Sequence, residues 1–136
     1  MDVVKIPGAD QKTILIVDDD PAILGLVSAL LEDVGYHVLT AESGPTGLAR
    51  SRDFKGDIQL LLSDFQMPGM SGVDLATVIT LDRPKIKVLL MSGFAEGMLV
   101  LNEGWHFLAK PFITSQLRAL VAGLVFPDLK SKFSGE

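Results

Sequence analysis

Acidic side chains follow two of the most apolar runs in this sequence of 136 residues. Asp18 and Asp19 come directly after residues 13–17, and Asp64 comes directly after residues 58–63. An apolar, β-branched run of this length is typical of a strand that is covered on both faces of a parallel sheet. Because ligands bind outside the carboxyl ends of such strands, we expect the three carboxylates to meet in one pocket.

A cluster of carboxylates needs a compensating charge. Two carboxylates about 4 Å apart repel by roughly 4 kcal/mol at an effective dielectric constant near 20. Either one of them stays protonated or a cation sits among them. An open, all-oxygen site with few protein carboxylates suits Mg²⁺, which keeps several waters and shares its coordination with phosphate oxygens.

Two further polar residues follow apolar runs in the same way. Ser92 comes after residues 86–91, and Lys110 comes after residues 105–109. Lysine is a point-charge partner for phosphate, and a serine hydroxyl is a small hydrogen-bond donor. A metal, a cation, a hydroxyl and an exposed carboxylate together describe phosphoryl transfer to Asp64, with electrostatics supplying most of the catalysis.

The rest of the sequence supplies the elements that position these groups. Asp20 and Pro21 are typical of a helix N-cap and first helical position, Gly35 is typical of a helix end, and Ser71 with Asp74 resembles a capping box. Apolar runs and helical periodicity define the remaining elements. We predict strands at 13–17, 37–41, 58–63, 86–91 and 105–109, and helices at 21–34, 44–50, 72–83 and 115–125.

Strands that alternate with helices form a parallel sheet with right-handed crossovers. The apolar strands 13–17 and 58–63 belong at the centre of the sheet, and the more polar strand 37–41 belongs at an edge. The prediction is a single flavodoxin-like, doubly wound α/β domain with strand order 2-1-3-4-5 and helices on both faces. We expect a flexible leader at 1–11, the folded domain at 12–126 and a polar tail at 127–136.

Composition argues against several classes of protein. The chain has no cysteine, which excludes disulfides, thiolate catalysis and Cys-based zinc sites. A net charge of −5, without clustered Lys or Arg, lacks the basic footprint of a nucleic-acid binder. No apolar run approaches the roughly 18 residues of a membrane span, and the first residues lack a signal-peptide pattern, so we expect no membrane contact and a cytoplasmic location.

The order and spacing of four motifs resemble the receiver domains of two-component response regulators. The resemblance covers about residues 12–126. The motifs are Ile16-Val17-Asp18-Asp19, Ser63-Asp64-Phe65-Gln66-Met67-Pro68-Gly69-Met70-Ser71-Gly72, Met91-Ser92-Gly93 and Phe107-Leu108-Ala109-Lys110-Pro111-Phe112.

This resemblance implies a phosphoacceptor rather than an enzyme with a separate substrate. Asp64 would accept a phosphoryl group from the phosphohistidine of a sensor histidine kinase or a histidine phosphotransfer protein. Asp19 and Asp64 would bind Mg²⁺ directly, Asp18 would assist through water, and Gln66 would contribute its backbone carbonyl. The domain would then control an output partner or an attached domain.

The resemblance also implies a conformational switch. Ser92 would bond a phosphoryl oxygen and Lys110 would pair with the phosphoryl group. Phe107 occupies the family's aromatic switch position, which turns inward when the serine moves. The family further implies a cis bond between Lys110 and Pro111, a form found in about 5 to 6% of X-Pro bonds generally.

Two features depart from the family's pattern. Residues 93–104 are shorter than its usual fourth helix region and include Gly97 and Gly104. We hypothesise that this helix is short or irregular and that the domain signals through another surface, or serves within a hybrid kinase or relay. Phe94 places an apolar ring at a position that, by the resemblance, tunes dephosphorylation in the family, so a polar residue there is predicted to shorten the phosphoryl lifetime.

Two other functions are compatible with parts of the sequence. A haloacid-dehalogenase-like phosphatase would use Asp18 as its nucleophile in the pattern Asp18-x-Asp20, but Ala22 stands where that motif usually has Thr or Val. A receiver-like interaction module that no longer takes phosphate would have lost an acid, the serine or the lysine, and none is lost here. Asp18→Asn and Asp64→Asn separate the phosphatase from the receiver.

Three leucines and two histidines carry weaker signals. Leu117, Leu120 and Leu124 fit either the core or a homodimer face. His37 and His106 both fall in predicted strands, whereas carrier histidines in phosphorelays sit on helices. We therefore interpret both as strand residues rather than as ligands or phosphocarriers.

Overall fold

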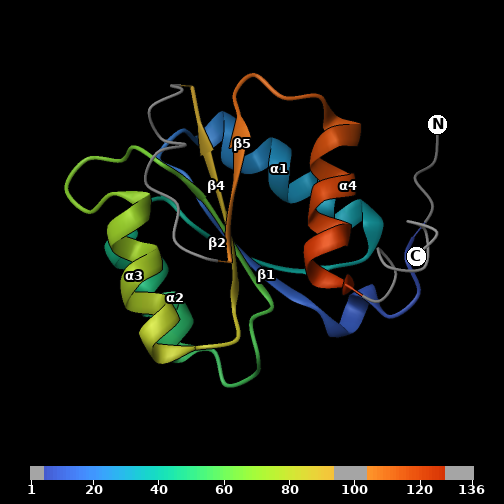
Figure 1. Ribbon diagram of the computed structural model, residues 1–136, viewed down its shortest axis with the longest axis horizontal. Coiled ribbons are helices and arrows are strands. Elements are labelled where there is room, and N and C mark those ends of the chain that lie inside the picture. The colour runs from blue at the N-terminus through green and yellow to red at the C-terminus, as the bar shows by residue number, and fades with distance from the viewer. Residues whose placement is uncertain (1–4, 94–103, 128–136) are drawn as a thin grey trace.

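The computed structural model describes residues 5–93 and 104–127, which form one parallel five-stranded sheet with helices on both faces (Figure 1). The strands follow the order β2-β1-β3-β4-β5, so the predicted flavodoxin-like topology is confirmed. The strands are β1 (Thr13–Val17), β2 (His37–Ala41), β3 (Leu60–Asp64), β4 (Lys87–Ser92) and β5 (Trp105–Ala109). The helices are the 3-10 helix η1 (Ala9–Gln11), α1 (Pro21–Val34), α2 (Gly44–Asp53), α3 (Gly72–Asp82) and α4 (Thr114–Val125).

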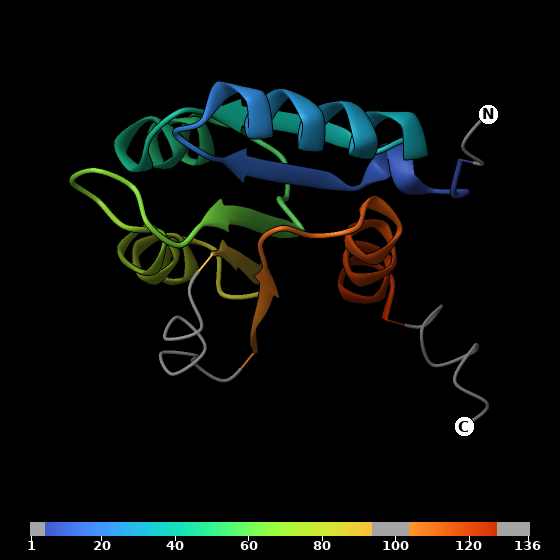
Figure 2. The ribbon, with the colours of Figure 1, turned by 90° about the horizontal axis from the view of Figure 1, so that it is seen from above.

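The helices form two layers around the sheet. Helices α2 and α3 cover one face, and α1 and α4 cover the other (Figures 1 and 2). Each face has its own apolar core, because successive side chains of a strand point to opposite faces. Ile16, Leu62 and Met91 pack with α1 and α4, whereas Leu15, Leu61 and Leu90 pack with α2 and α3.

The two strands that carry the acidic residues lie at the centre of the sheet. Every residue of β1 is buried, and β3 is buried up to Ser63. The edge strand β2 is exposed at His37 and half-buried over the next three residues, as its polar sequence predicted. The central strands therefore hold their carboxyl ends on a rigid, fully packed base.

The predicted helix signals are confirmed at three positions. The Asp20 side chain caps α1 by accepting from the backbone N–H of Ala22 at 2.9 Å, and Gly35 ends α1 with a φ of 117°. Ser71 and Asp74 form a reciprocal capping box at the start of α3. These caps fix the first turns of the two helices that follow the acidic strand ends.

The boundaries of five elements differ from their predictions, including α3, which ends at Asp82 rather than at residue 83. Strand β3 begins at Leu60 rather than Ile58, and β4 is shifted by one residue, because the strands pair in the register Leu60↔Lys87 to Asp64↔Met91. Helix α2 continues to Asp53, and α4 begins at Thr114. The predicted shape of residues 94–103, and Phe94 with it, lies outside the described residues.

The segment before β1 packs onto the domain where the structure describes it. The backbone N–H of Ile6 donates to Val34 at 3.1 Å, and Ala9 is fully buried in the core beneath α1. The predicted leader at 1–11 thus includes residues that contact the folded domain. Over the described ranges, none of the helices is long and apolar enough to cross a membrane.

Candidate phosphoacceptor and metal site

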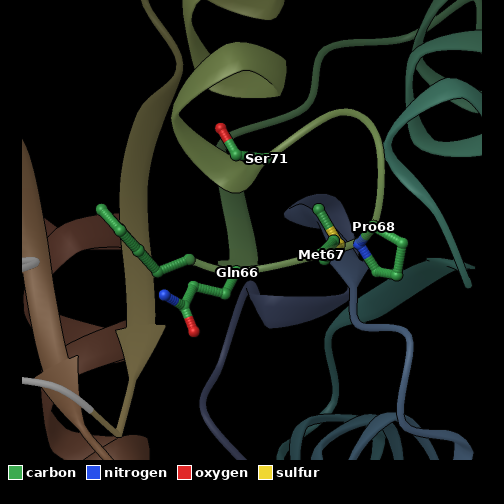
Figure 3. Close-up of a pocket in the computed structure, with 5 residues that line it drawn as sticks. Gln66, Met67, Pro68 and Ser71 are labelled. Carbon is green, nitrogen blue, oxygen red and sulfur yellow. The ribbon is translucent and has the colours of Figure 1, made fainter.

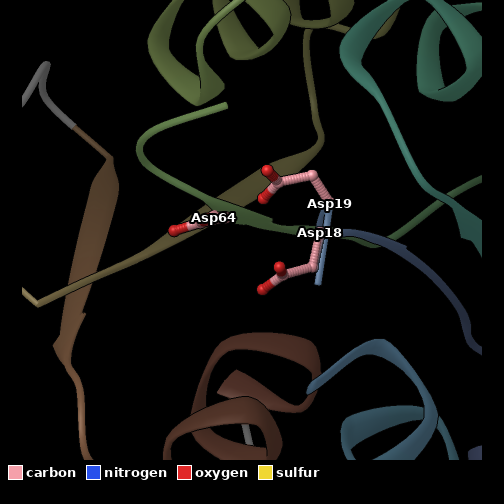
Figure 4. Close-up of side chains that lie close together, drawn as sticks. All are labelled: Asp18, Asp19 and Asp64. Atoms are coloured by element: carbon pink, nitrogen blue, oxygen red, sulfur yellow. The ribbon is translucent and has the colours of Figure 1, made fainter. Parts of the chain in front are cut away.

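Three carboxylates lie together at the carboxyl ends of the central strands. Asp18 and Asp19 follow β1, and Asp64 is the last residue of β3. One carboxylate oxygen from each lies within 4.8 Å of the others. Figure 4 shows all three side chains on the same side of the strand ends. The register Val17↔Ser63 explains this meeting, since the next residues of the two strands are Asp18 and Asp64.

The three carboxylates have different surroundings. Asp18 is fully buried, Asp64 is half-buried and Asp19 is exposed. Both oxygens of Asp18 are engaged: Oδ1 accepts from the backbone N–H of Asp20 at 2.9 Å, and Oδ2 accepts from Lys110 Nζ at 3.2 Å. Within the part of the chain that the structure describes, the Asp19 carboxylate makes no hydrogen bond or ion pair.

Lys110 brings a positive charge to this cluster from the end of β5. Its Nζ lies 3.2 Å from Asp18 Oδ2 and 3.4 Å from Asp64 Oδ1, so one ammonium group bridges two carboxylates. Its backbone N–H donates to the carbonyl of Ser92 at 2.8 Å, which ties the residue to β4. The Lys110–Pro111 bond is cis, as expected.

Burial and charge act on Asp64 in opposite directions. Burial raises the pKa of the Asp64 carboxyl above its ordinary value, Lys110 acts against this rise through its charge and hydrogen bond, and the charges of Asp18 and Asp19 add to it. Lys110 therefore supports the ionised form of a carboxylate that its other neighbours disfavour.

The donor set fits a magnesium ion. Asp19 is exposed and Asp64 is partly exposed, and hard oxygen ligands with room for water are what Mg²⁺ requires. Asp19 and Asp64 carry the more accessible carboxylates, whereas each oxygen of the buried Asp18 already accepts a hydrogen bond. This arrangement supports the expectation that Asp18 acts through water.

Ser92 and Phe107 lie on the neighbouring strands. Ser92 ends β4, is 3% exposed and pairs with Ala109. Phe107 lies on β5 opposite Leu90, and its half-buried ring contacts the ring of Phe65. Ser92 therefore lies at the end of the strand beside β3, whereas Phe107 lies in the middle of the edge strand β5.

The loop between β3 and α3 forms a hollow beside the acidic site. The hollow holds about 500 Å³ and is lined by Phe65, Gln66, Met67, Pro68 and Ser71. Gln66 to Pro68 lie in the loop, and Ser71 lies at the start of α3 (Figure 3). Gln66 thus directly follows the strand end at Asp64 and Phe65, where its backbone carbonyl was expected to serve the metal.

Three residues beside Asp64 have roles that sequence reasoning missed. Ser63 Oγ donates to the Asp64 carbonyl at 2.9 Å. A side chain at Gly72 would collide with that same carbonyl oxygen, so only glycine fits. Phe65 contacts the Phe107 ring. All three residues belong to the sequence motif around Asp64, which marked them as candidates. Their contacts could be identified only from the structure.

The weaker candidates lie away from this site. His37 and His106 are on the edge strands β2 and β5, as interpreted from the sequence, and His37 stacks on Phe54 at 5.7 Å. Leu117 and Leu124 are buried in the core, and Leu120 packs against it. These leucines therefore pack into the apolar core on this face of the sheet.

Comparison with known proteins matches residues 14–122 to the family described as the response regulator receiver domain. The phosphoglycerate transport system transcriptional regulatory protein PgtA of Salmonella typhimurium is 32% identical over 118 residues, which cover 82% of this chain and 28% of that protein. The sensor kinase CckA of Brucella abortus is 35% identical over 114 residues, covering 80% of this chain and 12% of that protein.

A solved structure supports the same relationship. The CheY-like response regulator receiver domain protein from Methanospirillum hungatei superposes with a TM-score of 0.79 at 32% identity, covering 88% of this chain and 98% of that one. This chain thus spans nearly all of a solved receiver domain but between about an eighth and a quarter of the two curated relatives.

Proposed function

The chain belongs to the response regulator receiver domain family, and we propose that Asp64 is the residue that takes up the phosphoryl group. The observation that carries this proposal is the charge arrangement at the strand ends. Lys110 Nζ lies 3.4 Å from Asp64 Oδ1, and the carboxylates of Asp18 and Asp19 lie within 4.8 Å of Asp64. An accessible nucleophile thus faces a cation and a set of metal ligands.

The proposed reaction is a transfer from a phosphohistidine to Asp64. A carboxylate oxygen of Asp64 attacks the phosphorus, an O–P bond forms and the N–P bond of the donor breaks. The electron pair of that bond stays on the imidazole nitrogen, which takes up a proton. Little covalent chemistry is left to the protein, so positioning and charge stabilisation supply the rate.

The other residues of the site hold the transferred group. Lys110 would pair with a phosphoryl oxygen once Asp64 is modified, and the Ser92 hydroxyl would donate to another. Asp19, Asp64 and the Gln66 carbonyl would hold Mg²⁺, with Asp18 behind them. Bound there, Mg²⁺ would neutralise charge on the phosphoryl oxygens during transfer.

The phosphatase alternative fits the geometry less well. It would require Asp18 as the nucleophile, yet this side chain is fully buried and both of its oxygens already accept hydrogen bonds. Asp64 is more accessible, and its carboxylate forms an ion pair with Lys110. We therefore propose that the domain catalyses only its own phosphorylation and dephosphorylation.

The partners follow from the same proposal. The donor would be the phosphohistidine of a sensor histidine kinase or of a histidine phosphotransfer protein. The relatives include a transcriptional regulatory protein and a sensor kinase, so the domain would serve either in a regulator or within a hybrid kinase. The output partner would read the phosphorylated state.

The test is intact mass after incubation with acetyl phosphate, with and without Mg²⁺. We expect a Mg²⁺-dependent gain of one phosphoryl group in the wild type and no gain in Asp64→Asn. Asp57→Asn is the matched control, since it removes the same charge from an exposed position outside the site. A gain that persists in Asp64→Asn would contradict the assignment of the acceptor.

A further inference from the structure

Phe65 is the residue that directly follows the proposed phosphoacceptor, and it contacts the proposed switch residue. Its ring and that of Phe107 lie 6.0 Å apart between centroids at an interplanar angle of 60°. This edge-to-face arrangement is one that aromatic pairs favour. The contact links the end of β3 to β5, which are separated in the sheet by β4.

The backbone of Phe65 is tied on both sides. Its N–H donates to the carbonyl of Met91 on β4 at 2.7 Å, and its carbonyl accepts from the N–H of Gly72 at the start of α3 at 2.9 Å. The preceding carbonyl, that of Asp64, accepts from Ser63 Oγ. Because these hydrogen bonds restrain the backbone on both sides, we expect a displacement of Asp64 to move Phe65 as well.

The Phe65 ring has space that a core side chain lacks. It is half-buried and borders the hollow of about 500 Å³ formed by the loop between β3 and α3. Phe107 is half-buried as well, whereas its register partner on β4, Leu90, is 1% exposed. Densely packed side chains resist movement, so the two half-exposed rings form the part of this layer that can rearrange.

We propose that Phe65 is a positioning residue that transmits the phosphorylation state of Asp64 to Phe107 through the contact of their rings. This inference rests on the proposed function, because it requires the phosphoryl group at Asp64. It assigns the coupling to a side chain of the loop, in addition to Ser92 on β4.

The chain carries a reporter for this coupling. Trp105 is its only tryptophan, and it lies two residues before Phe107 on β5. Residues two apart on a strand share a face. Trp105 and Phe107 both pack against the same apolar core, beneath α2 and α3. A movement of the Phe107 ring is therefore expected to change the tryptophan emission.

The experiment measures tryptophan emission and intact mass in the same samples before and after acetyl phosphate with Mg²⁺. In the wild type we expect one phosphoryl group and a change in emission. In Phe65→Leu we expect the same phosphoryl gain with loss of most of the emission change, and in Phe65→Tyr, which keeps the ring, we expect the change to return. Phe65→Leu combined with Phe107→Leu is expected to lose no more than either alone.

Phe54→Leu is the matched control. Phe54 is half-buried in the same core layer but stacks on His37 at the opposite edge of the sheet, so this variant should keep the emission change. Loss of the change in Phe54→Leu would reveal general loosening and overturn the proposal.

Two further outcomes separate the coupling from the proposed function. A full emission change in phosphorylated Phe65→Leu, or a phosphorylated wild type without any change, would overturn the coupling alone. A folded wild type that gains no phosphoryl group would overturn the proposed function, and the coupling with it.

Discussion

The Lys110 ammonium holds together two carboxylates that would otherwise repel each other. Asp18 is fully buried, and its carboxylate contacts this ammonium and the backbone N–H of Asp20. Removing one member of a buried pair costs more than removing both, because a charge is left without compensation. The stability of the domain should therefore respond strongly to this single cation.

The first prediction concerns Lys110→Met, which keeps the length of the side chain but removes its charge. We expect a loss of about 2 kcal/mol in the free energy of unfolding, below the value for a fully buried pair because Lys110 is partly exposed. Mg²⁺ should restore part of this loss, since it would compensate the same carboxylates. Urea unfolding with and without Mg²⁺ measures both effects.

Lys85→Met serves as the control, because Lys85 is exposed and lies in the turn before β4. It should change stability little, and Mg²⁺ should not alter its effect. Equal losses in the two lysine variants would contradict the bridging role of Lys110.

The second prediction is that Asp64→Asn stabilises the protein when Mg²⁺ is absent. It removes a charge that burial and two acidic neighbours disfavour, so we expect a gain of about 1–2 kcal/mol, less than one full pairwise repulsion because Lys110 already offsets part of it. Thermal unfolding of Asp64→Asn and of the control Asp57→Asn measures the gain. No gain over the control would contradict the account of the site.

The sign of the pH dependence follows from the same shift. The folded-state pKa of Asp64 is raised, so the native protein binds a proton there more readily than the unfolded chain does. The penalty from ionised Asp64 is thus present above the raised pKa and disappears as pH falls below its ordinary value. The stability gain of Asp64→Asn should therefore shrink in acid.

At the scale of elements, the carbonyl of Asp64 lies against the first residue of α3. A Cβ at Gly72 would collide with this backbone oxygen, and the contact cannot be relieved by turning a side chain. Either the end of β3 or the start of α3 must move to admit a methyl group. The close packing of Gly72 against the Asp64 carbonyl thus fixes the position of the Asp64 backbone relative to α3.

The third prediction compares two glycine substitutions. Gly72→Ala should destabilise the domain by about 2 kcal/mol or more through this overlap and should slow phosphorylation of Asp64. Gly25→Ala on α1 has open space around the new methyl group and should stabilise the domain by about 0.5–1 kcal/mol through helix propensity. Urea unfolding and the rate of mass gain measure both. Unchanged phosphorylation in folded Gly72→Ala would contradict the packing role.

Helices α2 and α3 are joined by Arg83. Its guanidinium donates to the carbonyls of Ser51, Phe54 and Gly56 and to the hydroxyl of Ser51, at 2.8–3.0 Å. These acceptors lie at the end of α2 and just beyond it, where helix carbonyls lack partners within the helix. One side chain thus caps α2 and anchors it to the end of α3.

The fourth prediction concerns this planar group. Arg83→Ala should cost about 2–3 kcal/mol, and Arg83→Lys should recover little, because an ammonium group cannot match the fork of five donors. Arg52→Ala breaks an exposed ion pair with Asp82 and should cost no more than about 1 kcal/mol. Denaturant unfolding ranks the three variants. Full recovery by Arg83→Lys would count against the geometric argument.

At the scale of the whole molecule, the sheet order followed from sequence because its signals are local and consistent. The continuous apolar runs of β1 and β3 marked the central strands, and the polar residues of β2 marked an edge. Caps such as Asp20 and Ser71 marked the helix starts to the residue. Because β1 and β3 are parallel neighbours, the acidic residues at their carboxyl ends were predicted to lie close together.

Other features could not be predicted because they depend on packing between distant segments. The register of β3 against β4 set the strand limits, which apolar content alone placed one or two residues early. The burial of Ala9 in the core with α1 was not predicted, because the preceding Pro-Gly pair is typical of a loop. The contact of Phe65 with Phe107 joins residues 42 positions apart, and no local pattern reports it.

The identity of the phosphorylated residue is the central claim, and locating the acyl phosphate tests it most directly. The wild-type protein would be treated with acetyl phosphate and Mg²⁺, reduced with borohydride and mapped by peptide mass spectrometry, since reduction converts an aspartyl phosphate to homoserine. We predict conversion at Asp64 and at no other aspartate. Conversion at Asp18 or Asp19 instead would contradict the account and favour a phosphatase-like nucleophile at the end of β1.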